Sequence, residues 1–268
     1  MENKNSKQTR MSRRQMLKTT GQGVTLAALA SAVGCSTAGM SGGANIVGST
    51  CLTICYLNSE DATFDFDYYR DNHLTLIMNL YGKDAIQRFE LHKPIEMPGA
   101  PPSPYLAHIN IYIRDAEAFA AAGAEHGPTL VADVANFTNA QLVAQNEIIW
   151  GESGGDLFST ELGQTCMAIV YPYEDGARFD PDYYRDNHMT LIMDLYGREA
   201  IRRFEVRKPS PMPEGNPLFM GSVNFYIESQ AAFDAAGLAH TDTLVADVPN
   251  FSSVFPLVIP SEIYGLDS

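Results

Sequence analysis

The chain has 268 residues, of which 45% are hydrophobic and 19% are charged, a composition that excludes a disordered, collagen-like or coiled-coil protein. Its length fits one large domain or two of ordinary size. Beyond residue 35 the chain holds 12 basic and 31 acidic residues, a net charge of −19. We therefore expect no nucleic-acid partner, because such binding needs Lys and Arg to neutralise phosphates.

The N-terminus has the pattern of an export signal. Arg13 and Arg14 precede a short apolar run from Val24 to Val33, an order typical of a twin-arginine (Tat) signal peptide. The run is too short to span a bilayer, which needs about 20 residues. We expect residues 1–35 to be a cleaved Tat-type signal peptide, and the mature protein to be periplasmic or anchored on the outer side of the cytoplasmic membrane. A basic, disordered tail is the alternative.

The leader ends in Ala-Val-Gly followed by Cys35, which resembles a lipobox. Lipidation of Cys35 would give a lipoprotein with a lipid anchor, and ordinary cleavage after nearby small residues is the alternative. Residues 36–50 are rich in Ser and Gly and predict a flexible segment.

Three further cysteines, Cys51, Cys55 and Cys166, are an odd number, which argues against a disulfide framework. Cys51 and Cys55 cannot pair within a strand, because four extended residues span about 13 Å, beyond the roughly 7 Å limit between Cα atoms. We expect buried, free thiols.

The chain contains an internal repeat. Residues 66–94 and 181–209 match at 21 of 29 positions with an offset of 115. The match extends on both sides, and we expect two units, residues 51–150 and 166–265, joined by a linker over residues 151–165.

Each unit shows the same order of predicted elements. A strand precedes a helix that starts at an N-capping aspartate, Asp65 or Asp180, and stops at Gly82 or Gly197. In the first unit the strands are expected at residues 51–57, 85–91, 106–113 and 142–150, and the second helix at residues 116–133. This βαββαβ order is the ferredoxin-like motif, a four-stranded antiparallel sheet with both helices on one face.

Two such sheets leave apolar faces that can cover each other. We therefore expect an α+β protein in which two ferredoxin-like units form a pseudo-dimer within one chain, and we leave open a higher oligomer.

One motif resembles a known family. The pattern is a Phe-Asp-x-Asp-Tyr-Tyr-x-x-x-His motif before a Leu/Ile/Met-rich helix that ends in Tyr-Gly. It stands at Phe64, Asp65, Asp67, Tyr68, Tyr69 and His73, and again at Phe179, Asp180, Asp182, Tyr183, Tyr184 and His188. It resembles the EthD family of the dimeric α/β-barrel superfamily. The resemblance implies units that pair sheet to sheet as a barrel. It also implies a small hydrophobic or aromatic partner molecule, in a family whose members are labelled reductases or accessory proteins.

The candidate catalytic residues are His73 and His188, with Tyr69 and Tyr184 positioning a substrate. At 100° per residue, Tyr69 and His73 share the apolar face of the first helix and Tyr68 lies on an opposing polar stripe. A histidine there is a candidate general acid or base near neutral pH. The alternative is a core histidine that donates to a backbone carbonyl.

Two aspartates farther along, Asp133 and Asp247, either orient a base or cap a turn. The chain has no spacing typical of a metal site and no GxGxxG, Walker or GxSxG motif, so we expect no metal, and the cofactor stays unknown.

Three classes of function remain. The first is an enzyme of oxidoreductase or isomerase type that works by cofactor-free acid/base chemistry on a small hydrophobic molecule. The second is a carrier of an apolar ligand such as haem. The third is an accessory protein whose barrel is filled by its own side chains.

Overall fold

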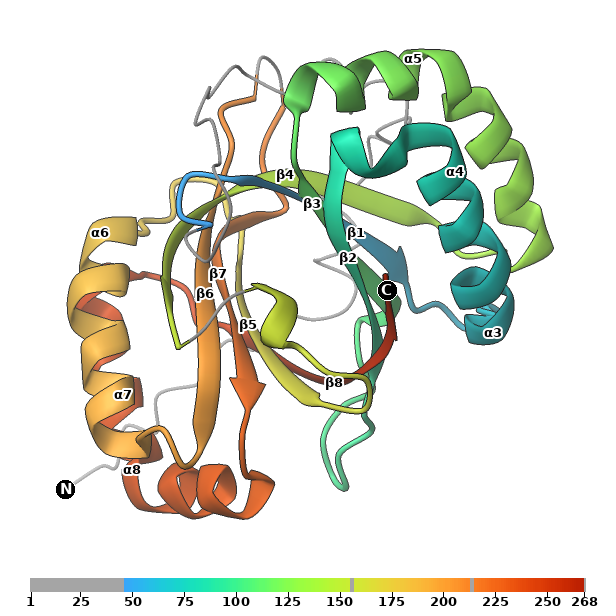
Figure 1. Ribbon diagram of the computed structural model, residues 1–268. Coiled ribbons are helices and arrows are strands. Elements are labelled where there is room, and N and C mark those ends of the chain that lie inside the picture. The colour runs from blue at the N-terminus through green and yellow to red at the C-terminus, as the bar shows by residue number, and fades with distance from the viewer. Residues whose placement is uncertain (1–45, 155–156, 213–214, 268) are drawn as a thin grey trace, which may run out of the picture.

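The computed structural model describes residues 46–154, 157–212 and 215–267 (Figure 1). The expected signal peptide, Cys35 and residues 36–45 lie outside these ranges. Within them, Ile46 is already buried, and the Gly48 N–H donates to the Ile149 carbonyl. No helix of the described ranges combines the length and the hydropathy needed to cross a bilayer.

Both units have the predicted βαββαβ order, with an interrupted first helix. The first unit consists of β1 (Thr50–Leu57), α3 (Phe66–Tyr68), the π-helical turn η2 (Tyr69–His73), α4 (Leu74–Ala85), β2 (Ile86–Pro94), β3 (Tyr105–Ile113), α5 (Ala116–Asp133), the 3₁₀ turn η3 (Val134–Asn136) and β4 (Leu142–Ser153). After η4 (Leu157–Ser159), the second unit consists of β5 (Thr165–Pro172), α6 (Pro181–Tyr183), η5 (Tyr184–His188), α7 (Met189–Tyr196), β6 (Ile201–Pro209), β7 (Phe219–Ile227), α8 (Gln230–Phe251) and β8 (Leu257–Leu266).

The first helix of each unit begins at the predicted aspartate, and the predicted glycine ends it in the second unit and breaks it three residues before its end in the first. The Asp65 carboxylate accepts from the Tyr68 N–H at 2.9 Å, and Asp180 caps α6 in the same way. Gly197 ends α7 with φ 71°, and Gly82 interrupts α4 with φ 75° and ψ 168°, a conformation that is essentially restricted to glycine.

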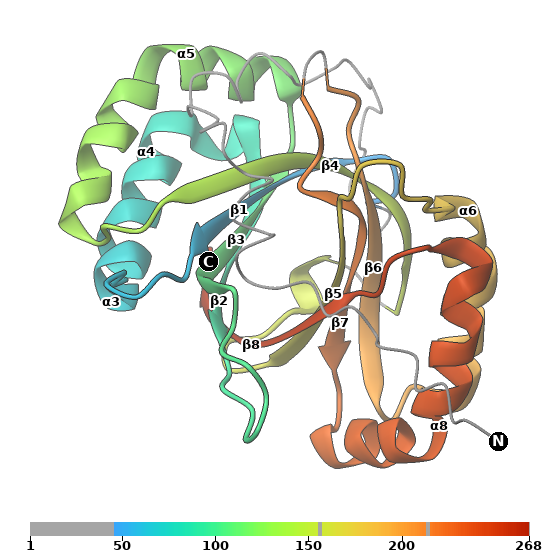
Figure 2. The same cartoon turned by 180° about the vertical axis from the view of Figure 1, so that it is seen from behind.

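The eight strands close into one barrel. Each unit supplies a four-stranded antiparallel sheet, ordered β2-β3-β1-β4 and β6-β7-β5-β8, and the pairs β2–β8 and β4–β6 join the two sheets. The helices of both units lie outside the barrel, on opposite sides of it (Figures 1 and 2). The prediction of two ferredoxin-like units paired as an intrachain α/β barrel is confirmed.

The inner faces of the two sheets carry charged as well as apolar side chains, whereas we expected apolar surfaces. The two largest apolar cores lie between each sheet and its own helices, as with Phe204 and Val206 of β6. Arg203, Glu205 and Arg207 alternate with them and point into the barrel, where all three are buried. A smaller apolar cluster, which includes Tyr105 and Phe219, joins the two units inside the barrel. Ion pairs between the sheets, such as that of Arg203 with Glu90, therefore accompany apolar packing inside the barrel. Cys51, Cys55 and Cys166 are free and buried.

Candidate functional site

The π-helical turn η2 brings Tyr68 and His73 to the same side of the first helix. In an α-helix these residues, five apart, would lie about 140° from each other. The Leu74 N–H instead donates to the Tyr69 carbonyl, an i→i+5 bond that widens the turn. Tyr68 and His73 therefore both reach the same carboxylate, that of Asp133 at the end of α5.

Four side chains form what we call the His73 cluster: Tyr68, His73, Asp133 and Asn136. The Nδ1 atom of His73 lies 2.8 Å from Oδ2 of Asp133. The other carboxylate oxygen, Oδ1, accepts hydrogen bonds from the Tyr68 hydroxyl at 2.9 Å and from the Asn136 amide at 2.8 Å. The Asn136 amide also donates to the Tyr68 hydroxyl at 3.2 Å. The carboxylate of Asp133 is thus held on both oxygens.

The electrostatics of the cluster favour a neutral imidazole. Burial lowers the pKa of His73, and the hydrogen bond to Asp133 opposes this effect only in part. Burial alone would raise the pKa of Asp133, but the hydrogen bonds from His73, Asn136 and Tyr68 outweigh it, so the pKa is lowered. An ionised Asp133 accepts the proton on Nδ1, which leaves the lone pair of His73 on Nε2.

Tyr69 is placed differently from its neighbour. It is fully buried, and its ring packs against Tyr56, Phe64 and Phe137, and against His73 at 5.0 Å between ring centroids. Burial raises its pKa well above the usual value. The helical wheel thus placed Tyr68 on the wrong face: Tyr68, and not Tyr69, bonds to the carboxylate.

The second unit repeats this arrangement. His188 Nδ1 lies 2.8 Å from Asp247 Oδ2, and Tyr183 and Asn250 donate to Oδ1 at 3.0 and 2.7 Å. Tyr184, like Tyr69, is buried among aromatic rings. Both aspartates therefore orient a histidine, one of the two roles that their position in the sequence allowed.

An open pocket of about 700 Å³ adjoins the His73 cluster. Asn136 and Phe137 line it, and the Phe137 ring also lies 4.7 Å from the imidazole of His73, which is 4% exposed. The other lining residues are Thr63, Phe64, Asp65, Phe66, Asp67, Lys93, Ala135, Thr138, Asn139 and Tyr264. Tyr264 comes from β8 of the second unit, so both units build the pocket at the β2–β8 seam.

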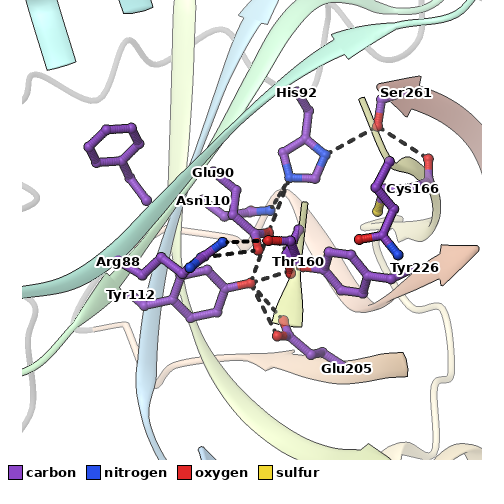
Figure 3. Close-up of polar contacts among 12 residues, drawn as sticks. Arg88, Glu90, His92, Asn110, Tyr112, Thr160, Cys166, Glu205, Tyr226 and Ser261 are labelled. Carbon is purple, nitrogen blue, oxygen red and sulfur yellow. Dashed lines mark hydrogen bonds and ion pairs between the residues drawn. The ribbon is translucent and has the colours of Figure 1, made fainter. Parts of the chain in front are cut away.

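A second group of titratable residues lies inside the barrel (Figure 3). Among the described residues, three arginines and three glutamates are buried: Arg88, Arg203, Arg207, Glu90, Glu147 and Glu205. Tyr226 donates to Glu90 at 2.6 Å and Tyr112 to Glu205 at 2.9 Å, and His92 Nδ1 lies 3.1 Å from the Ser261 hydroxyl. Only about 20 Å³ remains in the cavity that adjoins this network. This is room for about one water molecule.

Haem does not fit either cavity. The barrel cavity is too small, and the described residues that line the open pocket include no histidine, cysteine or methionine to bind the iron. Tyr264, the tyrosine among them, donates its hydroxyl to Asp67 at 2.7 Å. Within the described part of the chain, no group of three or more His, Cys, Asp or Glu is arranged to hold a metal ion.

Comparison with known proteins identifies the first unit. The family model of the EthD domain matches residues 58–141. The chain contains an EthD domain. The second repeat carries the same order of elements and the same cluster as this EthD domain. No curated protein matches the chain.

Several solved structures are similar to this chain. An EthD-like protein from Ralstonia eutropha JMP134 is 30% identical over 38% of this chain and 94% of its own, with a TM-score of 0.35. An anthrone oxidase-like protein is 12% identical, covering 82% of this chain and 93% of its own, with a TM-score of 0.51. A Fusobacterium nucleatum protein named as a monooxygenase is 5% identical, covering 83% of this chain and 94% of its own, with a TM-score of 0.52. The last two share the fold of the barrel.

Proposed function

We propose that this is an exported protein that binds a small, neutral aromatic molecule in the open pocket and transfers a proton on it through His73. The observation that carries the proposal is the 2.8 Å contact of His73 with Asp133, directly behind a pocket wall made of Asn136 and Phe137. The Tat-type leader supports the export.

The lining of the pocket favours a neutral ligand with an aromatic ring. Phe64, Phe66 and Tyr264 offer ring surfaces. The side chains of Thr138 and Asn139 already form hydrogen bonds with Thr63. The charged groups have partners within the protein. Lys93 Nζ lies 5.1 and 4.7 Å above the Phe66 and Tyr264 rings, and Asp67 accepts from the Tyr264 hydroxyl at 2.7 Å. The anthrone oxidase-like protein of the same fold is named for an aromatic ketone.

His73 is suited to the role of base. Its Nε2 lone pair would take a proton from an acidic C–H or O–H group, and the electron pair of the broken bond would stay on the substrate. The imidazolium formed is stabilised by the Asp133 carboxylate, which Tyr68 and Asn136 hold in place. Because Phe137 lines the pocket and its ring packs against the imidazole, the mechanism requires this ring to turn so that the base can meet the substrate.

The test uses 2-tetralone, a neutral aromatic ketone with acidic C–H groups, in D₂O. Proton NMR follows the replacement of these hydrogens by deuterium. The protein should accelerate this exchange above the buffer rate, and His73→Gln and Asp133→Asn should each lose at least about 10²-fold of the acceleration. His126→Gln, in a half-buried position on α5, should not change it.

The burial of His73 favours a second candidate function, that of a binding protein that catalyses no reaction. The imidazole is only 4% exposed beneath Phe137. If 2-tetralone binds and the wild-type protein exchanges its hydrogens no faster than buffer, the catalytic proposal is wrong and this second function stands.

A further inference from the structure

The two His–Asp clusters are alike, but the surfaces beside them are not. Tyr68, His73, Asp133, Asn136 and Phe137 all return unchanged in the second unit, at offsets of 115 and 114. Half of the twelve positions that line the open pocket differ between the units. Thr63 becomes Arg178, Phe66 becomes Pro181, Ala135 becomes Pro249, Thr138 becomes Ser252, Asn139 becomes Ser253 and Tyr264 becomes Trp150.

The change from Thr63 to Arg178 places a guanidinium where the first unit has its pocket. Arg178 donates to the Asn250 carbonyl at 2.9 Å and to the Pro249 carbonyl at 2.5 Å. Pro249 and Asn250 correspond to Ala135 and Asn136, which line the pocket in the first unit. The Arg178 side chain therefore lies across the equivalent pocket wall in the second unit.

The backbone around these two residues is the same, so the side chain makes the difference. The Thr63 N–H donates to the Asn139 side chain at 2.8 Å, and the Arg178 N–H donates to the Ser253 hydroxyl at 2.9 Å. Thr63 is short and stays at the rim of its pocket. Arg178 is long enough to bridge from the same backbone position to the carbonyls opposite.

Two other substitutions change the aromatic surface of the second site. Pro181 removes the aromatic ring that Phe66 supplies to the first pocket. Trp150, in the place of Tyr264, donates to Asp182 at 3.0 Å, and Lys208 Nζ lies 2.9 Å above its ring. The second site thus has a larger ring at the β4–β6 seam, under a lysine equivalent to Lys93.

We propose that the chain has one working site for a neutral aromatic ligand, the pocket of the first unit, and that Arg178 closes the corresponding site of the second unit. Thr63 and Arg178 are thus the residues that decide access to the two sites. This inference rests on the proposed function for the identity of the site, but it concerns binding and not the proton transfer.

The experiment exchanges the two residues. Crystals of the wild-type protein, Thr63→Arg and Arg178→Thr are soaked in 6-bromo-2-tetralone, and the anomalous signal of bromine locates each bound molecule. We expect one site in the wild type, between Phe66, Asn136 and Tyr264. We expect at least a tenfold lower occupancy in Thr63→Arg and a second site beside Asn250 in Arg178→Thr. Because both side chains are exposed, both variants should fold, which their thermal unfolding checks.

The outcomes separate this inference from the proposed function. Equal bromine peaks in both halves of the wild type, or an unchanged pattern in both variants, would overturn the role of Arg178 and leave the chemistry of His73 untouched. A single peak in the first unit, without hydrogen exchange of 2-tetralone, would support this inference and overturn the catalysis. No peak in either half of any of the three proteins would overturn the binding site itself.

Discussion

His73 and Asp133 are 60 positions apart in the chain, and their side chains meet at 2.8 Å between Nδ1 and Oδ2. His188 and Asp247 meet at the same distance in the second unit. Each pair connects the start of the first helix to the C-terminal end of the second, so the site also contributes to the packing of the two helices on their sheet.

The two buried histidines make the stability of the folded protein depend on pH. The pKa values of His73 and His188 are lowered by burial in the folded protein, whereas an unfolded histidine titrates near pH 6.5. Below that pH the unfolded chain binds more protons than the folded one, so stability must fall as the pH drops from about 6.5 toward the folded pKa values. Thermal unfolding between pH 7.5 and 5 measures this slope.

The matched variants for this prediction are His73→Gln with His188→Gln, and His126→Gln as the control. The double variant should have a flatter dependence of melting temperature on pH over this range, and the control should keep the wild-type slope. An equal slope in all three proteins would mean that the two buried histidines do not carry the effect.

The ion pairs inside the barrel should be costly to break. Arg203 is fully buried and pairs with Glu205 and, at 3.6 Å, with Glu90. Arg203→Met leaves buried carboxylates without this partner and should destabilise the protein by about 3–5 kcal/mol in urea unfolding. Its neighbour Arg202 pairs at the surface with Glu228, so Arg202→Met should cost only about 0–1 kcal/mol. Similar losses for both would show that the barrel interior tolerates unpaired charge.

Gly82 should resist substitution more than glycine in a regular helix. Its φ of 75° and ψ of 168° are open to glycine alone, so Gly82→Ala should cost about 1–3 kcal/mol even though a Cβ there would meet no neighbouring atom. Gly237 lies within α8 with ordinary space around it, and Gly237→Ala should instead stabilise the protein by about 0.5–1 kcal/mol. Chemical denaturation of both variants measures the two changes in the free energy of unfolding, which should have opposite signs.

The Tat-type signal peptide proposed for residues 1–35 can be tested separately. Replacing Arg13 and Arg14 together by Lys should stop export by the twin-arginine route, because the receptor reads the paired arginines. Cell fractionation and the intact mass of the mature protein measure this, and Cys35→Ser tests whether the mass includes a lipid. Unchanged export of the Arg-to-Lys variant would exclude the Tat route.

The fold was predictable from the sequence because its signals are local. Asp65 and Gly82 mark the ends of the first helix, and the repeat at an offset of 115 shows that a second unit follows. The polar barrel interior was also visible in principle. In β6, Arg203, Glu205 and Arg207 alternate with Phe204 and Val206, which assigns the charges to one face of the strand.

The site was only partly predictable because it depends on non-local geometry. The histidines could be singled out, but a wheel at 100° per residue cannot represent the π turn that moves Tyr68 beside His73. The pairing with Asp133 depends on how α5 packs on the sheet, which no local pattern records. The Arg178 side chain, likewise, finds its carbonyl partners about 70 residues away.

The rate of hydrogen exchange of 2-tetralone as a function of pH tests the central claim most directly. If His73 is the base, the rate with the wild-type protein should rise with pH as the imidazole loses its proton. It should reach a plateau with a midpoint below 6.5, because burial lowers the pKa of His73. His73→Gln should abolish this profile. A profile that is the same in the wild type and in His73→Gln would contradict the account.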